Sequence, residues 1–306
     1  MVEKFFSGNI ELSDDKGRVS VASSENAMYG APQQNRPPPI MPARVYPPAC
    51  RCIYCGSERY STGKTRVRGT EHIVANGLNG TWLLPEASCQ RCERITCKDE
   101  AKVLRGFMHG IRLKGRFKTN SGWPDELPLF LSDGRKVKVH IDDYLYNLML
   151  LDFEAPSILT GAEEGTAVRN VLMSVHEFDW EKLAAKYGIF GNPITPRVDQ
   201  EAFNRVLAKI AHAYTVAELG LDNFEAVLPS RILDRTDALR RYVGGGAEYP
   251  PPASDNLHEV EIEPRSPDHD WIIVRIRLLA YYATPIYRVV SGRWLDQTEA
   301  PTNSEG

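Results

Sequence analysis

The sequence predicts an α+β protein organised around a cysteine-rich segment at residues 52–97. Two CxxC pairs, Cys52/Cys55 and Cys89/Cys92, are typical of a structural metal site. Residues 199–219 carry apolar side chains at helical spacing, whereas residues 136–141 alternate like a half-buried strand. We therefore expect three parts: a flexible Pro-rich arm at 1–48, a zinc-bound unit at 49–118 and an α+β unit at 119–306.

The four cysteines of the CxxC pairs predict a closed tetrahedral zinc site, because thiolates are the preferred ligands of structural zinc. Four unligated thiols in a reducing compartment are the alternative. Cys50 is a second candidate ligand, since it lies beside Cys52. We expect Cys97, on the helix that follows, to be a buried free thiol.

Charge is distributed unevenly along the chain. The whole sequence has a net charge of −3, but residues 51–118 hold 14 Lys and Arg against 6 Asp and Glu. This difference predicts a basic working face on an acidic body. The start of the chain lacks the apolar segment of a signal peptide and no stretch has the length of a membrane span, so we expect a cytoplasmic protein without a membrane partner.

A helix is expected from Glu86 onward, with Pro85 in its first turn. Its apolar face is expected to hold Leu104, Phe107, Met108 and Ile111. Basic side chains recur on it at intervals of three or four residues, and this stripe consists of Arg91, Arg94, Lys98, Lys102 and Arg105. Such charges are usually a solvated face, and the alternative is a row of contacts to phosphate groups.

The remainder of the chain predicts further mixed structure. Residues 144–153 fit either a strand or a helix, and residues 177–187 and 229–242 are expected to be helices. Strands are expected at 258–263, 271–282 and 285–291. None of these segments contains a catalytic motif.

Between the CxxC pairs lies an acid–histidine pair, Glu71-His72, and Glu93 follows the last ligand cysteine. A histidine can deprotonate water near neutral pH, and carboxylates can hold a divalent ion that stabilises a phosphate. In a strand these two neighbours point to opposite faces, so both reach one site only if the backbone is bulged. The alternatives for His72 are a structural histidine or a zinc ligand. The other histidines have no partner that the sequence identifies.

The run EHIVANGLNG, followed by ASCQRCE, resembles the ββα-metal core of HNH endonucleases, in which a D/E-H-I segment lies between two CxxC knuckles. The resemblance covers about residues 50–105. It implies a zinc-stapled, treble-clef-like HNH domain in the N-terminal part of the chain.

The resemblance also implies roles for individual residues. His72 would be the general base, and Glu71 and Glu93 would bind a catalytic Mg²⁺ or Mn²⁺. Ala75-Asn76 replace the proline of the motif, and its paired glycines are split as Gly77 and Gly80. The central Asn of the motif has three candidate counterparts, which are Glu86, Ser88 and Asn79.

We therefore expect a metal-dependent HNH endonuclease, a hydrolase that cleaves DNA, with RNA left open as the alternative substrate and with a role in defence or restriction. Phosphate contacts are expected from Lys64, Arg66, Arg68, Arg91 and Arg94. Two other functions fit the same residues. One is a zinc-dependent nucleic-acid-binding module without catalysis, and the other is an adaptor that docks a protein partner through the unit at 119–306.

Overall fold

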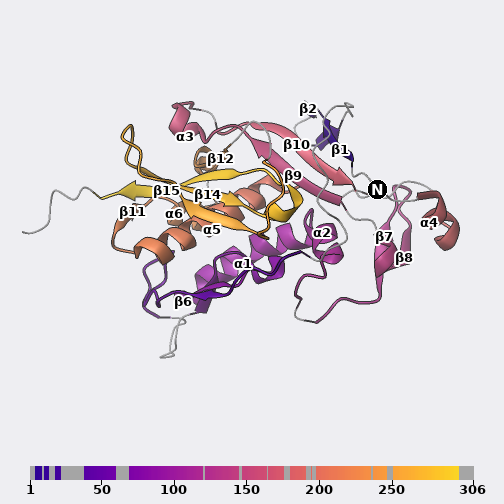
Figure 1. Cartoon of the computed structure of the whole chain (residues 1–306), viewed down its shortest axis with the longest axis horizontal. Coiled ribbons are helices and arrows are strands. Elements are labelled where there is room, and N and C mark those ends of the chain that lie inside the picture. Colours follow the sequence, from indigo (N-terminus) through magenta and orange to yellow (C-terminus); the bar gives the residue numbers. More distant parts are fainter. Residues whose placement is uncertain are drawn as a thin grey trace, which may run out of the picture.

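A computed structural model describes residues 4–8, 10–13, 18–21, 38–59, 69–119, 121–144, 147–163, 165–175, 180–190, 194, 198–235, 237–246 and 251–295. Small sheets and helices are mixed along the chain, which confirms the α+β class (Figure 1). The described part contains six α-helices, which are α1 Gln90–Arg105, α2 His109–Lys114, α3 Ser157–Thr160, α4 Trp180–Tyr187, α5 Gln200–Leu219 and α6 Pro229–Asp234. Its 3₁₀ turns are η1 Asn76–Leu78, η2 Ile141–Asp143, η3 Asp237–Arg241 and η4 Ala280–Tyr282.

The C-terminal sheet is antiparallel. It consists of β11 Phe224–Ala226, β12 Val243–Gly245, β13 Glu259–Ile262, β14 Trp271–Arg277 and β15 Tyr287–Trp294. The three strands expected in this region are confirmed, although the segment predicted as 271–282 ends in the turn η4. The helix predicted at 229–242 is wrong as one element, because the left-handed residue Arg235, with φ 56°, follows α6 and precedes η3.

Three smaller sheets complete the described strands outside the cysteine-rich segment. One orders β1 Lys4–Gly8, β10 Val168–Val175 and β9 Asn147–Phe153, and two hairpins pair β2 Ile10–Ser13 with β3 Arg18–Val21 and β7 Glu126–Phe130 with β8 Lys136–His140. The ambiguous segment 144–153 therefore contains a strand. The hairpin β7–β8 and helix α4 lie together at one end of the molecule (Figure 1).

The cysteine-rich segment and the short strand before it form a mixed sheet, with one parallel and one antiparallel pairing. Strand β6 Trp82–Ser88 pairs parallel with β4 Arg44–Val45 and antiparallel with β5 Gly69–His72. The expected helix start at Glu86 is therefore wrong: Pro85 and Glu86 lie inside β6, and α1 begins only at Gln90. Backbone pairing on both sides of β6 decides this boundary, and Cys89 ends the strand in an extended conformation.

Helix α5 lies between the C-terminal sheet and α1, and it packs against both (Figure 1). It follows the prediction for 199–219 closely. Asp199 caps its start by accepting a hydrogen bond from the Ala202 backbone N–H at 2.9 Å, and Gly220 ends it with φ 85°. Every residue from 202 to 216 is buried, so α5 is surrounded by protein over most of its length.

The largest hydrophobic core contains residues from both sides of the boundary predicted at residue 118. Phe107, just after α1, packs edge to face against Phe203 of α5 at a ring-centroid distance of 5.2 Å. Strands β1 to β4 fall within the range predicted as a flexible arm, and β1 pairs with β10. The division into three parts stays a prediction. Within the part of the chain described above, no helix combines the length and apolar character that a membrane crossing requires.

Candidate metal centre and the surface beside it

The four cysteines of the two CxxC pairs converge at one point. The sulfur atoms of Cys52, Cys55, Cys89 and Cys92 all lie within 4.8 Å of one another. A zinc ion with four thiolate ligands at about 2.3 Å separates its sulfurs by about 3.8 Å. The 3.7 Å between the sulfurs of Cys55 and Cys89 matches that spacing, so the cluster can hold a zinc ion.

Local backbone geometry explains how these cysteines converge. The first pair lies in a tight knuckle in which the Gly56 N–H donates to the Cys52 carbonyl at 2.8 Å, and Gly56 adopts φ 71°, which glycine reaches without strain. The second pair lies at the start of α1, where Cys89 is the N-cap residue and Cys92 is in the first turn. An Ile53 N–H to Ala87 carbonyl bond of 2.8 Å joins knuckle and strand. A bound ion would therefore clamp the knuckle to the helix.

The other two cysteines are not in the cluster. Cys50 and Cys97 are free and exposed, so the expectation that Cys97 is buried is wrong. The pKa of the Cys97 thiol is nevertheless raised to about 11, first by partial burial and then by the carboxylates of Glu100, Glu71 and Glu93. These three acids therefore lie around the same part of α1.

Strand β5 carries the acid–histidine pair beside the cysteine cluster. The pairing of β5 with β6 shifts register between Gly69 and Glu71, so the backbone is irregular beside the pair. Glu71 and His72 nevertheless differ in how far their side chains are buried. Glu71 is 7 % exposed, whereas His72 is only partly buried. The two side chains therefore have separate surroundings.

The Glu71 carboxylate is engaged by a buried lysine of α5. The Nζ atom of Lys209 lies 2.6 Å from one Glu71 oxygen, and the Tyr54 hydroxyl donates to the other at 3.2 Å. Lys209 also lies 2.9 Å from Oε1 of Glu100 on α1 and donates to the backbone carbonyl of His72. Burial lowers the pKa of Lys209, but Glu100 and Glu71 more than offset it, so the net shift is upward and Lys209 is charged.

The implied catalytic Mg²⁺ or Mn²⁺ does not fit this arrangement. Both oxygens of the Glu71 carboxylate have protein partners, and one partner is itself a cation. A divalent ion beside the Lys209 ammonium would face a like charge in a buried site. Glu93, the other implied ligand, is partly buried in the first turn of α1.

The imidazole of His72 is the accessible part of the pair. Its ring has no hydrogen-bond partner within the described ranges, and its pKa is lowered by burial, by the charge of Lys209 and by Lys118. The resulting preference for neutral imidazole suits a general base. The group of cysteines that can hold a metal ion does not include His72.

Three residues were candidates for the central Asn of the motif. Asn79 follows η1 with a left-handed φ of 58°, and its side-chain oxygen accepts the Lys118 backbone N–H at 2.8 Å. It therefore ties the η1 turn to the segment after α2. Glu86 adopts φ 51° inside β6, and Ser88 is buried at the end of that strand. The counterpart of the central Asn stays a prediction among these three residues.

The outer face of α1 is uniformly basic. The five cations of the predicted stripe, Arg91, Arg94, Lys98, Lys102 and Arg105, are all exposed. Of these, only Lys102 has an acidic partner in the described part of the chain, Asp199 at 3.1 Å. The acids Asp99 and Glu100 on α1 face inward, where Arg235 and Lys209 pair with them. The expected contacts Lys64, Arg66 and Arg68 lie outside the described residues.

Two histidines without an identified sequence partner prove to be buried connectors. His212 of α5 has Nε2 2.7 Å from the Ile53 carbonyl, and His258 has Nε2 2.7 Å from the Leu78 carbonyl. The Leu279 backbone N–H donates to Nδ1 of His258 at 3.1 Å, so that ring is neutral and protonated on Nε2. Together with Lys209, these histidines join the C-terminal half to the cysteine-rich segment. Sequence reasoning overlooked them, although Arg205, Lys209 and His212 recur at helical spacing on one buried helix.

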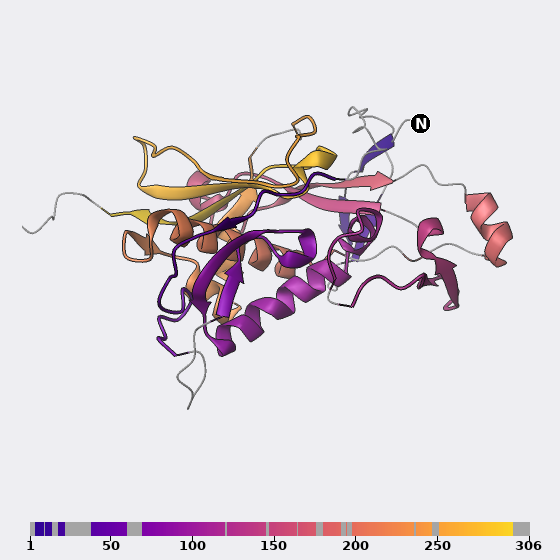
Figure 2. The same cartoon turned by 60° about the horizontal axis from the view of Figure 1, so that its bottom comes forward.

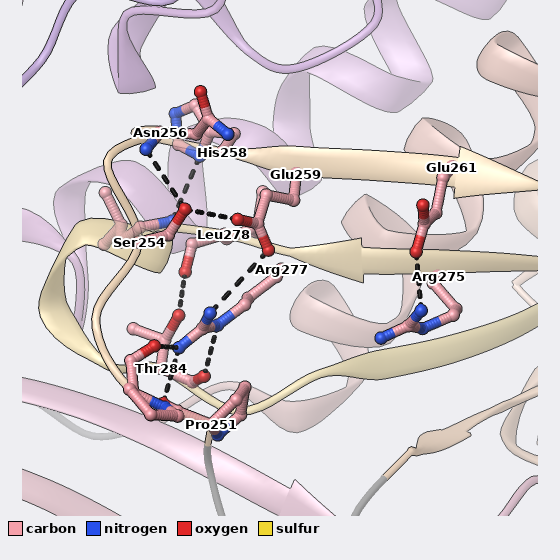
Figure 3. Close-up of polar contacts among 12 residues, drawn as sticks. Pro251, Ser254, Asn256, His258, Glu259, Glu261, Arg275, Arg277, Leu278 and Thr284 are labelled. Atoms are coloured by element: carbon pink, nitrogen blue, oxygen red, sulfur yellow. Dashed lines mark hydrogen bonds and ion pairs between the residues drawn. The ribbon is translucent and has the colours of Figure 1, made fainter.

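A polar network holds the loop that positions His258 (Figure 3). Arg277 donates to the Thr284 carbonyl at 2.9 Å and to the Pro251 carbonyl at 2.7 Å, and it lies 3.7 Å from Glu259. Beside this network is a cavity of about 430 Å³ whose lining includes Trp82, Glu259 and Glu261. Both carboxylates have arginine partners, Arg277 for Glu259 and Arg275 for Glu261, so this cavity offers no unpaired cation, and the basic face of α1 is the better candidate for an anionic partner.

Comparison with known proteins identifies no relative: no family model, no curated protein and no solved structure matches this chain.

Proposed function

We propose that this protein binds nucleic acid through the exposed face of α1, on a scaffold clamped by zinc at the four cysteines. The observation that carries the proposal is the basic stripe on α1, where five exposed cations lie along one face and the inward acids have their own cations. A row of exposed cations, of which Lys102 alone has an acidic partner in the described part of the chain, is suited to phosphate groups, because binding releases condensed counterions. The resemblance of residues 50–105 to a nuclease core supports the same kind of partner.

Zinc has a structural role in this proposal. The cluster lies at the start of α1, so a bound ion would hold the start of the helix against the Cys52–Cys55 knuckle, which a backbone hydrogen bond joins to β6, the partner strand of β5. Figure 2 shows α1 running along the outside of the molecule, with these strands beside it. The basic face therefore points to solvent from a rigid support, as a surface that contacts a nucleic-acid backbone requires.

The test measures the binding of a short duplex DNA and of a matched duplex RNA by fluorescence anisotropy over a range of salt concentrations. Replacing Arg94 and Lys98 by Gln is expected to weaken binding roughly ten-fold or more at low salt and to reduce the salt slope by about 2. The matched control replaces Lys136 and Lys138, two exposed lysines of β8 at the far end of the molecule. Equal losses in both variants would refute a specific surface on α1.

A metal-dependent HNH endonuclease is the second candidate function. It is favoured by His72, whose neutral and partly exposed imidazole lies at the end of β5, between the two knuckles in sequence. The contact between Glu71 and Lys209 argues against it, because the carboxylate is not free to bind a divalent ion. Plasmid nicking in Mg²⁺ that is lost in His72→Ala, with zinc content and thermal stability unchanged, would make cleavage the function. An inactive wild-type protein that still binds DNA would leave binding as the function.

A further inference from the structure

The ammonium of Lys209 occupies a site built entirely of oxygen atoms. Glu71 on β5 and Glu100 on α1 each place a carboxylate oxygen within 3 Å of Nζ, at 2.6 and 2.9 Å. The His72 carbonyl accepts a hydrogen bond from the same nitrogen, and the Ile73 carbonyl lies 3.5 Å away. Lys209 is only 2 % exposed, so water does not replace these contacts.

Such a ligand set is the kind that a hard divalent cation takes. Mg²⁺, Mn²⁺ and Ca²⁺ bind carboxylate and carbonyl oxygens. Oε1 of Glu100 is buried and has no well-aligned hydrogen bond in the described part of the chain, so its contact with Lys209 is an ion pair. The positive charge of Lys209 therefore stabilises this oxygen without a well-aligned hydrogen bond.

We propose that Lys209 is a built-in cation that fills an oxygen-lined cation site between β5 and α1, so that this protein takes no divalent ion there. The same two carboxylates become a divalent-cation site when the amine is removed. This inference does not depend on nucleic-acid binding, since it concerns only the inner side of α1.

A covalently attached cation has consequences that a bound ion lacks. It cannot dissociate, and it adds a fixed connection from α5 to both β5 and α1. For Lys209 to leave, its charge would have to reach water from a 2 % exposed position, and both carboxylates would lose their counter-charge. A divalent ion therefore has to overcome the full cost of expelling the lysine before it binds.

The test compares the wild-type protein, Glu71→Gln, Lys209→Met and the triple variant Lys209→Met/Glu71→Gln/Glu100→Gln, each with its zinc retained. Binding of Mn²⁺ is followed by the loss of the free-ion electron paramagnetic resonance signal, and melting temperature is recorded with and without millimolar Mn²⁺. We expect wild type and Glu71→Gln to bind the same amount of Mn²⁺, because Lys209 already occupies the site in the wild-type protein. Lys209→Met is expected to melt roughly 5–10 °C lower, to regain most of that loss with Mn²⁺ and to bind a single ion that the triple variant does not bind.

Two outcomes would overturn the proposal. One is wild-type binding of Mn²⁺ that Glu71→Gln abolishes, which would mean that Lys209 moves aside. The other is a folded Lys209→Met that binds no ion. If Lys209→Met fails to fold, the triple variant decides: its folding supports the charge role, because it removes the two uncompensated carboxylates, and its failure refutes that role. Loss of DNA binding in any variant would bear on the proposed function and leave the ion measurements unaffected.

Discussion

Two clusters of potential metal ligands lie along α1, and they differ in where the positive charge comes from. The four sulfurs at the start of the helix lie within 4.8 Å of one another, and no cationic side chain lies among them in the described structure. About two to three turns further on, Glu100 of α1 and Glu71 of the neighbouring strand β5 surround the ammonium of Lys209. The first cluster requires an ion from solution, whereas the second is complete within the chain.

The difference shows that ligand type alone does not identify a metal site. Thiolates that are packed together repel one another unless a cation binds, and zinc satisfies them in a closed tetrahedron. Carboxylates can be satisfied equally well by a lysine or an arginine brought from elsewhere in the fold. A sequence therefore indicates a cysteine site more reliably than a carboxylate site.

The largest expected effect comes from breaking the cysteine cluster. Cys92→Ser is expected to remove zinc and to destabilise the protein by about 5 kcal/mol or more, because structural zinc contributes directly to folding. Zinc content by mass spectrometry and urea denaturation would measure this. Cys97→Ser, on the same helix but exposed and free, is the matched control and should retain both zinc and stability.

The second cluster is tested by a double-mutant cycle between Glu71→Gln and Lys209→Met. Lys209→Met leaves two buried carboxylates without their counter-charge, so we expect a loss of about 3–5 kcal/mol, whereas Glu71→Gln leaves Lys209 with Glu100 and should cost less. The coupling energy between the two changes is expected to be well above about 1 kcal/mol. The comparison cycle uses Asp199→Asn and Lys102→Met, an exposed pair at 3.1 Å, for which we expect about 0–1 kcal/mol. Equal coupling in the two cycles would contradict the distinction drawn here between buried and exposed cations.

The buried histidines give a prediction about pH. Burial lowers the pKa of His258 to about 4, although its bond to the Leu78 carbonyl opposes the shift, whereas the unfolded chain retains a value near 6.5. The unfolded state therefore binds more protons between these values, so stability is full above pH 6.5 and falls as the pH decreases toward 4. We expect this residue to contribute up to ~3 kcal/mol of acid destabilisation.

His258→Gln should weaken that pH dependence, measured as urea midpoints for wild type and variant across the same range. Taking the difference between the two proteins cancels the protonation of the zinc thiolates, which both share. An unchanged slope in His258→Gln would assign the acid sensitivity to other groups, among them His212, whose pKa burial also lowers to about 4.

The smallest effect on stability is expected on the outer face of α1. Arg94→Gln and Lys98→Gln remove exposed side chains without partners in the described part of the chain, so stability should change by less than about 0.5 kcal/mol. Affinity for duplex DNA should fall in the same variants. Substitutions on the outer face of α1 should therefore change affinity and leave stability unchanged, whereas substitutions on its inner face should change stability first.

The sequence alone determined the features that depend on local spacing. The CxxC pairs predicted the cysteine cluster because a two-residue gap lets both thiolates of a knuckle face one point, and the cap residues and apolar period of 199–219 predicted α5. The exposed basic stripe on α1 followed from helical spacing in the same way.

Only the tertiary structure decided what the carboxylates do. Glu71 and Lys209 are 138 residues apart in sequence, and neither residue type nor local spacing indicates that the folded chain brings them to 2.6 Å. The start of α1 was likewise set by the pairing of β6 with β4 and β5, which overrode the local preference of Pro85. Contacts between distant segments depend on the packing of α5 against α1. That packing is a property of the whole core rather than of any one stretch of sequence.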